Sequence, residues 1–86
     1  MMGWDDCIEF NQAAFRQGIT AENIRYTVNH PRYEGPLEDD EHKYIIVGFD
    51  QTGTLLEILY NRIDDETVNV FHAMKCRNIF LPLLDA

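Results

Sequence analysis

Three strand-like segments separated by short turns constrain the fold of this chain more than any other feature. Residues 43–49, 54–60 and 67–73 are rich in β-branched and aromatic side chains, as strands are. Between the first two, residues 50–53 read Asp-Gln-Thr-Gly, in which Asp favours the start of a turn and Gly its end. Residues 62–66 supply the next turn. Strands so close in sequence pair as hairpins, and we therefore expect an antiparallel meander.

The segments on either side of the meander carry helical patterns. Apolar side chains recur every three or four positions from about residue 4 to residue 17, which predicts an N-terminal helix. Thr20 can cap a second helix, which must end before Pro31. Residues 76–83 again show helical spacing, although Pro82 limits that helix to its first turns. The expected fold is α+β, with two N-terminal helices, an antiparallel three- to four-stranded sheet and a short C-terminal helix.

The stretch between the second helix and the meander predicts a short edge strand and a loop. The strand is expected at Arg32-Tyr33-Glu34, and the loop at residues 35–42. Four consecutive acids at 38–41 favour a solvated loop, and a docking site for a basic partner is the alternative.

Alternation along the strands predicts which side chains share a face of the sheet. Glu57 is expected on the same face as Leu55 and Leu59, and we expect the more polar face to carry Glu57, Asn69 and Lys43. In the last strand, we expect two sets on opposite faces: Val68, Val70 and His72, and Asn69, Phe71 and Ala73.

Length and charge limit the classes of protein to which the chain can belong. Its 86 residues suffice for a single domain spanning 1–86. A formal net charge of -8 disfavours non-specific binding to nucleic acids and anionic membranes, and favours a basic partner protein. No apolar run approaches the roughly 20 residues of a membrane span, and residues 1–6 lack the features of a signal peptide. We therefore expect a cytoplasmic protein with no membrane partner, in which Cys7 and Cys76 are reduced.

A local group of cations stands out against this acidity: His72, Lys75 and Arg77 lie within six residues of one another. Histidine side chains titrate near neutral pH, so His72 is a candidate general acid or base. Lys75 and Arg77 are candidates for a phosphate clamp. Two alternatives stay open: a partly buried His72 bonded to backbone, and surface cations that balance nearby acids. No metal-ligand or phosphate-loop motif occurs, and we expect neither metal nor cofactor.

Several short motifs resemble the BrnT-type toxins of bacterial toxin–antitoxin pairs, which belong to the wider group of RelE-like ribonuclease toxins. The similar segments are the joint Gln17-Gly18-Ile19-Thr20, the helix end Val28-Asn29-His30-Pro31, the hairpin at 46–58 and the strand end at 70–77. The resemblance implies a metal-independent endoribonuclease that acts on RNA and is held by an antitoxin protein. It implies catalytic roles for His72, Arg77 and Lys75, and substrate binding by Lys43 and Arg62.

The net charge keeps a second function open. A non-enzymatic protein-interaction module of the same fold, bound to a basic partner protein, would account for the acids at 38–41. Formation of a homo-oligomer is compatible with either hypothesis.

Overall fold

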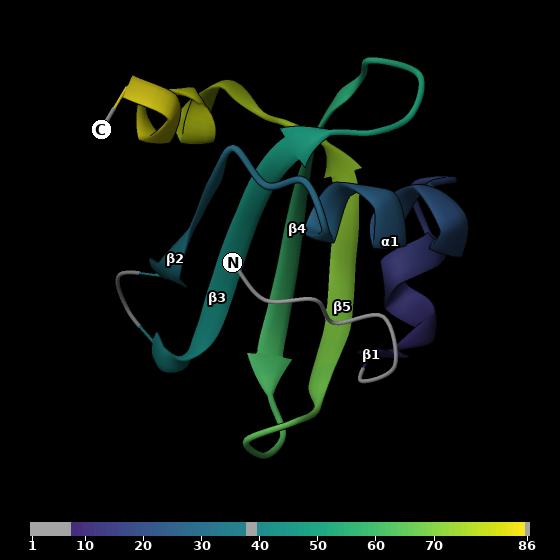
Figure 1. Cartoon of the computed structure of the whole chain (residues 1–86), viewed down its shortest axis with the longest axis vertical. Helices are drawn as coiled ribbons and strands as arrows, with labels where there is room; N and C mark the ends of the chain where they lie inside the picture. Colours follow the sequence, from purple (N-terminus) through teal and green to yellow (C-terminus); the bar gives the residue numbers. More distant parts are fainter. Residues whose placement is uncertain (1–7, 38–39, 86) are drawn as a thin grey trace.

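A five-stranded mixed sheet in the order β1-β5-β4-β3-β2 forms the centre of the molecule (Figure 1). The computed structural model describes residues 8–37 and 40–85, with backbone alone at residues 40 and 41. The strands are β1 (Ile8–Phe10), β2 (Tyr33–Leu37), β3 (Asp40–Phe49), β4 (Leu55–Arg62) and β5 (Val68–Lys75). The helical elements are the α-helix α1 (Ala21–Val28) and the 3-10 helices η1 (Gln12–Phe15) and η2 (Asn78–Asp85).

The three strand-like segments of the sequence form β3, β4 and β5, which pair antiparallel as predicted. The turn at residues 50–53 is also confirmed, since the Gly53 amide donates to the Asp50 carbonyl at 3.1 Å. Gly53 has φ +85°, a value that glycine adopts without steric cost. The Asp50 carboxylate accepts hydrogen bonds from the amides of Thr52 and Thr54, at 2.8 and 3.0 Å. Local chemistry thus determines this hairpin.

The predicted N-terminal helix is wrong, because its described part forms β1 and η1. Residues Ile8–Phe10 pair in parallel with Val68–Val70, which makes the sheet mixed rather than antiparallel. Asn11 has extended backbone, and its side-chain oxygen accepts from the Ala13 amide at 2.8 Å. Such a local bond competes with a continuous helix. The otherwise unpaired edge of β5 supplies hydrogen-bond partners to the residues that precede Asn11. Residues 4–7 of the predicted helix lie outside the described residues.

The second predicted helix is confirmed as α1, where Thr20 Oγ1 accepts from the Asn23 amide at 3.1 Å. One N-terminal α-helix therefore replaces the predicted two. The predicted short C-terminal helix is present as η2, a 3-10 rather than an α-helix, with Pro82 inside it. Proline lacks the amide that an α-helix needs and clashes with the preceding turn.

The region before the meander contains more strand than predicted. The expected edge strand is confirmed but extends over Tyr33–Leu37, and β3 begins at Asp40. Much of the predicted loop at 35–42 therefore belongs to a β2–β3 hairpin, while Glu38 and Asp39 lie outside the described residues. The predicted α+β arrangement is thus replaced by a strand-rich fold with a five-stranded mixed sheet.

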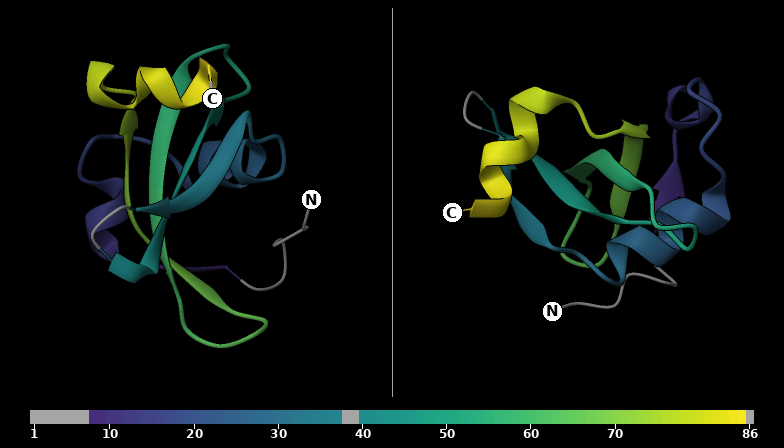
Figure 2. Two further views of the ribbon diagram at one scale, coloured as in Figure 1. Left: turned by 90° about the vertical axis from the view of Figure 1, so that its left-hand side faces the viewer. Right: turned by 90° about the horizontal axis from the view of Figure 1, so that it is seen from above.

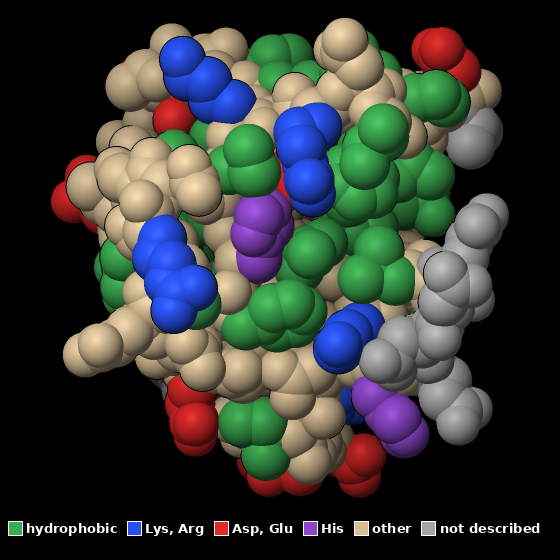
Figure 3. All heavy atoms as spheres, turned by 180° about the vertical axis from the view of Figure 1, so that it is seen from behind, with side chains coloured by type: hydrophobic (Ala, Val, Ile, Leu, Met, Phe, Trp, Pro, Cys, Tyr) green, Lys and Arg blue, Asp and Glu red, His purple; other side chains and the backbone are tan. Residues whose placement is uncertain are grey.

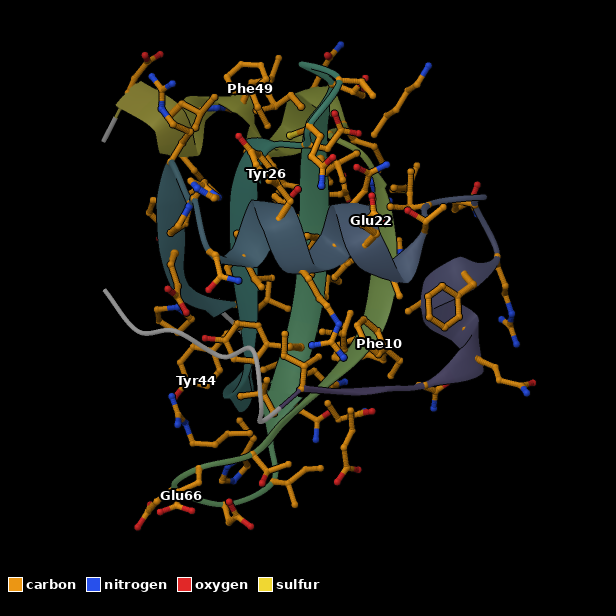
Figure 4. The ribbon with its side chains drawn as sticks, turned by 45° about the vertical axis from the view of Figure 1, so that its right-hand side comes forward. Phe10, Glu22, Tyr26, Tyr44, Phe49 and Glu66 are labelled. Atoms are coloured by element: carbon orange, nitrogen blue, oxygen red, sulfur yellow. The ribbon has the colours of Figure 1, made fainter. Side chains whose placement is uncertain are left out.

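One face of the sheet, called the helix face, is covered by η1 and α1 (Figures 1 and 2). Figure 4 shows α1 crossing this face, with Tyr44 and Phe10 beside it. Tyr44 and Phe10 pack against a cluster of buried side chains. Burial stabilises each large apolar side chain of that cluster by about 1.5–3 kcal/mol. The buried members are Ala14, Ile24, Val28, Ile46, Leu56, Ile58, Tyr60, Val68, Val70 and Ala73.

A β-bulge in β5 decides which residues reach the opposite face, called the second face. In register with β4, Leu59 opposes His72 and Tyr60 opposes Val70, so that Phe71 is an extra residue. The bulge reverses the alternation, and Ala73 joins Val70 in the core of the helix face. The predicted grouping of Val68, Val70 and His72 on one face is therefore wrong, because His72 lies on the second face.

Candidate functional site

A carboxylate in the interior of the sheet, that of Glu57, is the centre of the candidate site. Alternation along β4 places Glu57 on the second face, and the residue is fully buried, with 0% of its surface exposed. A buried charge is strongly unfavourable unless donors surround it. The contacts of this carboxylate therefore decide what the second face can do.

Arg77 supplies most of the donors to Glu57. Its backbone amide donates to Oε1 at 2.8 Å, and its Nε lies 3.0 Å from Oε1 and 3.1 Å from Oε2. Its Nη2 donates to Oε2 at 2.7 Å. His72 completes the group, with Nε2 at 2.9 Å from Oε2. Glu57, His72 and Arg77 form what we call the Glu57 cluster.

The hydrogen bonds of the Glu57 cluster favour the ionised forms of Glu57 and Arg77. Burial alone would raise the pKa of Glu57, but hydrogen bonds from the Arg77 side chain and amide and from His72 outweigh it. The pKa of Glu57 therefore lies below its ordinary value of 4.5. The bond to Glu57 likewise raises the pKa of Arg77. At neutral pH the cluster thus contains a buried carboxylate matched by a guanidinium.

Chain geometry at the end of β5 brings Arg77 over Glu57. The Cys76 amide donates to the Leu55 carbonyl at 2.9 Å, which holds the chain against β4 for one residue beyond the strand. The Arg77 guanidinium then lies 5.5 Å from the Phe80 ring, at the start of η2. Burial and the negative charge of Glu57 raise the pKa of the Cys76 thiol, which disfavours the reactive thiolate.

Three of the five residues predicted for the site lie on the second face. His72 and Arg77 contact the same carboxylate. Lys43 lies on this face near Phe71, with Nζ 5.7 Å from the ring centroid. The structure therefore gathers one histidine and two cations on a single surface.

The other two predicted residues lie on the helix face. Lys75 opposes Leu56 of the core, belongs to β5, and is exposed. Arg62 places its guanidinium 5.8 Å from the Tyr44 ring, on the opposite face of the sheet from His72. The structure does not bring these two cations together with the Glu57 cluster.

Sequence reasoning placed Glu57 on the polar face but gave it no role in the site. The available signal was a single acid inside the apolar run Leu55-Leu56-Glu57-Ile58-Leu59 of a central strand. A charge in such a position needs a partner from another element, and the sequence does not identify that partner.

The second face differs in character from the protein as a whole. Figure 3 shows hydrophobic side chains across it, with Lys, Arg and His side chains between them and most visible acidic side chains at the rim. Phe49 is 40% exposed and Ile79 69% exposed, and η2 contains no buried residue. The Arg32 guanidinium lies 5.7 Å from the Phe49 ring. This face is thus apolar and locally cationic.

Other parts of the described chain add little to the site. A shallow hollow of about 380 Å³ lies along α1, lined by Glu22, Arg25, Tyr26, Asn29, His30 and Gln51. It belongs to the helix face, so the sheet separates it from Glu57. Among the described residues, no group of three or more His, Cys, Asp or Glu side chains could hold a metal ion. No helix within 8–37 or 40–85 has the length and apolar character needed to cross a membrane.

Comparisons with models of known protein families, with curated proteins and with solved structures find no match to this chain. Functional inference therefore depends on the chemistry of the second face.

Proposed function

We propose that the protein is a metal-independent endoribonuclease, the toxin of a toxin–antitoxin pair similar to the BrnT-type toxins. The observation that supports this proposal is the His72 ring, whose side chain is 25% exposed while Nε2 contacts a buried carboxylate. An imidazole is a common general acid or base in catalysis. In RNA, His72 would accept the proton of a ribose 2′-hydroxyl as its oxygen attacks phosphorus. The 5′-oxygen of the next nucleotide would leave and take up a proton.

Cations on the same face would stabilise the negative charge that develops on the phosphate. The Arg77 side chain is 47% exposed despite its bonds to Glu57, and its Nη1 makes none of those bonds. Lys43 supplies a second positive charge, and Phe71 next to it offers a ring on which a base can stack. We assign proton transfer to His72, phosphate stabilisation to Arg77 and substrate binding to Lys43.

An RNA-cleavage assay with the purified protein tests this proposal. We expect the wild-type protein to cleave single-stranded RNA in the presence of a metal chelator. The His72→Gln variant should be at least about 100-fold slower, and its parallel purification controls for contaminating nucleases. Intact RNA after incubation with folded wild-type protein, or equal cleavage by both proteins, would refute the proposal.

The two lysines on opposite faces identify the surface that binds RNA. Lys43→Gln and Lys75→Gln change the net charge equally, but Lys43 lies on the second face and Lys75 on the helix face. We expect Lys43→Gln to weaken RNA binding more than Lys75→Gln. A larger loss with Lys75→Gln would place the substrate on the helix face and contradict our assignment.

A protein-interaction role without catalysis is the second candidate function, and the exposed apolar side chains of η2 favour it. Ile79, Leu81 and Leu84 are 69%, 39% and 37% exposed. Two cations of the second face, Arg77 near the Phe80 ring of η2 and Arg32 near the Phe49 ring, favour a partner segment that carries carboxylates between apolar side chains. This differs from the basic partner that the net charge alone suggests.

Co-expression with the protein encoded by the neighbouring gene tests the interaction. Ile79→Asp should abolish co-purification, and binding should weaken as the salt concentration rises. Ile63→Asp is the matched control, because Ile63 is 50% exposed in the turn after β4 and lies outside η2. Equal losses with both variants would argue against docking on η2.

A further inference from the structure

We propose that Glu57 is a positioning residue that keeps His72 Nε2 protonated, so that Nδ1 is the atom that takes up and releases a proton. The catalytic meaning of this inference rests on the proposed ribonuclease function. The protonation pattern itself does not, because it follows from the contacts of the Glu57 cluster.

The first step concerns the charge of Glu57. Both of its oxygens accept hydrogen bonds from Arg77, Oε1 from the amide and Nε and Oε2 from Nη2 and Nε. A proton on either oxygen would point toward donors that are themselves protonated. Arginine is always charged in proteins and has no acceptor atom. Glu57 is therefore an ionised carboxylate, which can only accept hydrogen bonds.

The second step concerns the ring of His72. Nε2 lies 2.9 Å from Glu57 Oε2, and the hydrogen atom in this contact cannot come from an ionised carboxylate. The hydrogen must belong to Nε2, whether the imidazole is neutral or positively charged. Protonation and deprotonation of the ring therefore occur at Nδ1.

The third step concerns access to Nδ1. The His72 side chain is 25% exposed, whereas Glu57, which Nε2 contacts, is 0% exposed. Within the described part of the chain, Nδ1 has no hydrogen-bond partner. In the neutral ring, its lone pair is thus available to a substrate hydroxyl, as a general base requires.

His30 provides an internal comparison. Its Nδ1 lies 2.7 Å from the Tyr26 carbonyl oxygen, which can only accept a hydrogen bond. Neutral His30 should therefore carry its proton on Nδ1, the opposite tautomer to that of His72.

Long-range proton–nitrogen NMR of the ¹⁵N-labelled full chain tests the inference, at a pH where the rings are neutral. For His72 we expect Nε2 to show the shift of a protonated nitrogen and Nδ1 that of an unprotonated one, with the reverse pattern for His30. The His72→Gln and His30→Gln spectra assign the signals. A protonated Nδ1 in neutral His72 would overturn the inference.

A histidine side chain in water already favours a proton on Nε2, so a variant must show that Glu57 is responsible. In Glu57→Gln, we expect the Nε2 proton of His72 to exchange faster with water and its resonance to be lost. An unchanged Nε2 proton signal in this variant would overturn the role of Glu57. If Glu57→Gln does not fold, the wild-type protein provides the test. The Nε2 proton of His72 should exchange with water more slowly than the Nδ1 proton of His30, and equal or faster exchange would overturn the role of Glu57.

The NMR test of the His72 tautomer and the RNA-cleavage test of the proposed function can fail independently. A correct tautomer in a protein that leaves RNA intact would refute ribonuclease activity and leave the positioning of His72 by Glu57 supported. RNA cleavage by a protein with the opposite tautomer would refute the positioning alone.

Discussion

Replacing Arg77 with methionine should destabilise the protein substantially, because it removes the charge that matches buried Glu57. The variant keeps the backbone amide of residue 77 at 2.8 Å and His72 Nε2 at 2.9 Å as donors to the carboxylate. It loses the contacts of Nε and Nη2, which lie between 2.7 and 3.1 Å from the carboxylate oxygens. Methionine retains most of the apolar stem, so that the substitution tests charge rather than packing.

The expected loss in the free energy of unfolding follows from the burial of Glu57 and Arg77. Removing one member of a buried ion pair typically costs about 3–5 kcal/mol. Arg77 is 47% exposed, so water can approach Glu57 in the variant, and two donors remain. We therefore expect a loss of about 2–3 kcal/mol in the free energy of unfolding at pH 7. For a domain of this size, the melting temperature would fall by roughly 10–20 °C.

The loss should also depend on pH. In the wild-type protein the folded-state pKa of Glu57 is lowered, so its stabilisation is present above pH 4.5 and disappears as pH falls through the folded pKa. Without the guanidinium, burial should raise the pKa of Glu57 above 4.5. The deficit of the variant is then largest at neutral pH and shrinks as pH falls toward 4.5.

Urea unfolding followed by circular dichroism at several pH values measures both effects. Arg32→Met is the matched control, since Arg32 lies 5.7 Å from the Phe49 ring and should cost less than about 1 kcal/mol. The double variant Glu57→Leu, Arg77→Met should recover much of the stability, because no buried charge is left unmatched. Equal losses for Arg77→Met and Arg32→Met, or a loss that does not change with pH, would refute the reasoning.

Four further predictions are checked by the same unfolding measurement. Tyr60→Phe should cost about 1–3 kcal/mol, because the buried hydroxyl donates to Glu34 Oε2 at 2.6 Å; an unchanged stability would mean that this bond contributes nothing. Gly48→Ala should cost about 1–3 kcal/mol, because a Cβ would lie 3.1 Å from the His30 carbonyl oxygen and 3.2 Å from Thr27 Cγ2. Gly18→Ala, with open space but φ +83°, should cost about 1–2 kcal/mol from backbone strain alone. Asp50→Ala should cost about 1–2 kcal/mol at pH 7. Burial alone would raise the pKa of Asp50, but hydrogen bonds from Thr52, Thr54 and Gly53 have the larger effect and bring it below its ordinary value of 3.8. The difference in stability between the wild-type protein and Asp50→Ala should therefore vanish as pH falls below 3.8.

Elements governed by neighbouring residues were predictable from the sequence. The turn at residues 50–53 depends on an aspartate that binds amides two and four positions later and on a glycine with positive φ. The start of α1 depends on Thr20 and an amide three positions later. In both cases the stabilising groups lie within one turn of chain, where spacing alone defines their geometry.

The candidate site was predictable only in part. His72 and Arg77 are near one another in sequence, which predicts them, together with Lys75, as candidates, whereas Glu57 is 15 positions from His72. Pairing of β4 with β5 brings the carboxylate to the histidine, and that register includes an extra residue at Phe71. Without knowledge of the bulge, alternation assigns His72 to the wrong face.

The sequence by itself determined the β3–β4–β5 meander, the cap of α1 and the excess of cations near residue 72, because each depends on local chemistry. Tertiary structure alone decided that Ile8–Phe10 forms a strand, since the edge of β5 supplies hydrogen-bond partners that no nearby residue provides. It also decided which cations share a surface, sending Lys43 and Arg77 to the face of His72 and Lys75 and Arg62 to the other. For His72 and Lys75 the physical reason is that a strand has a two-residue repeat, so the extra residue Phe71 exchanges the faces of the β5 side chains beyond it.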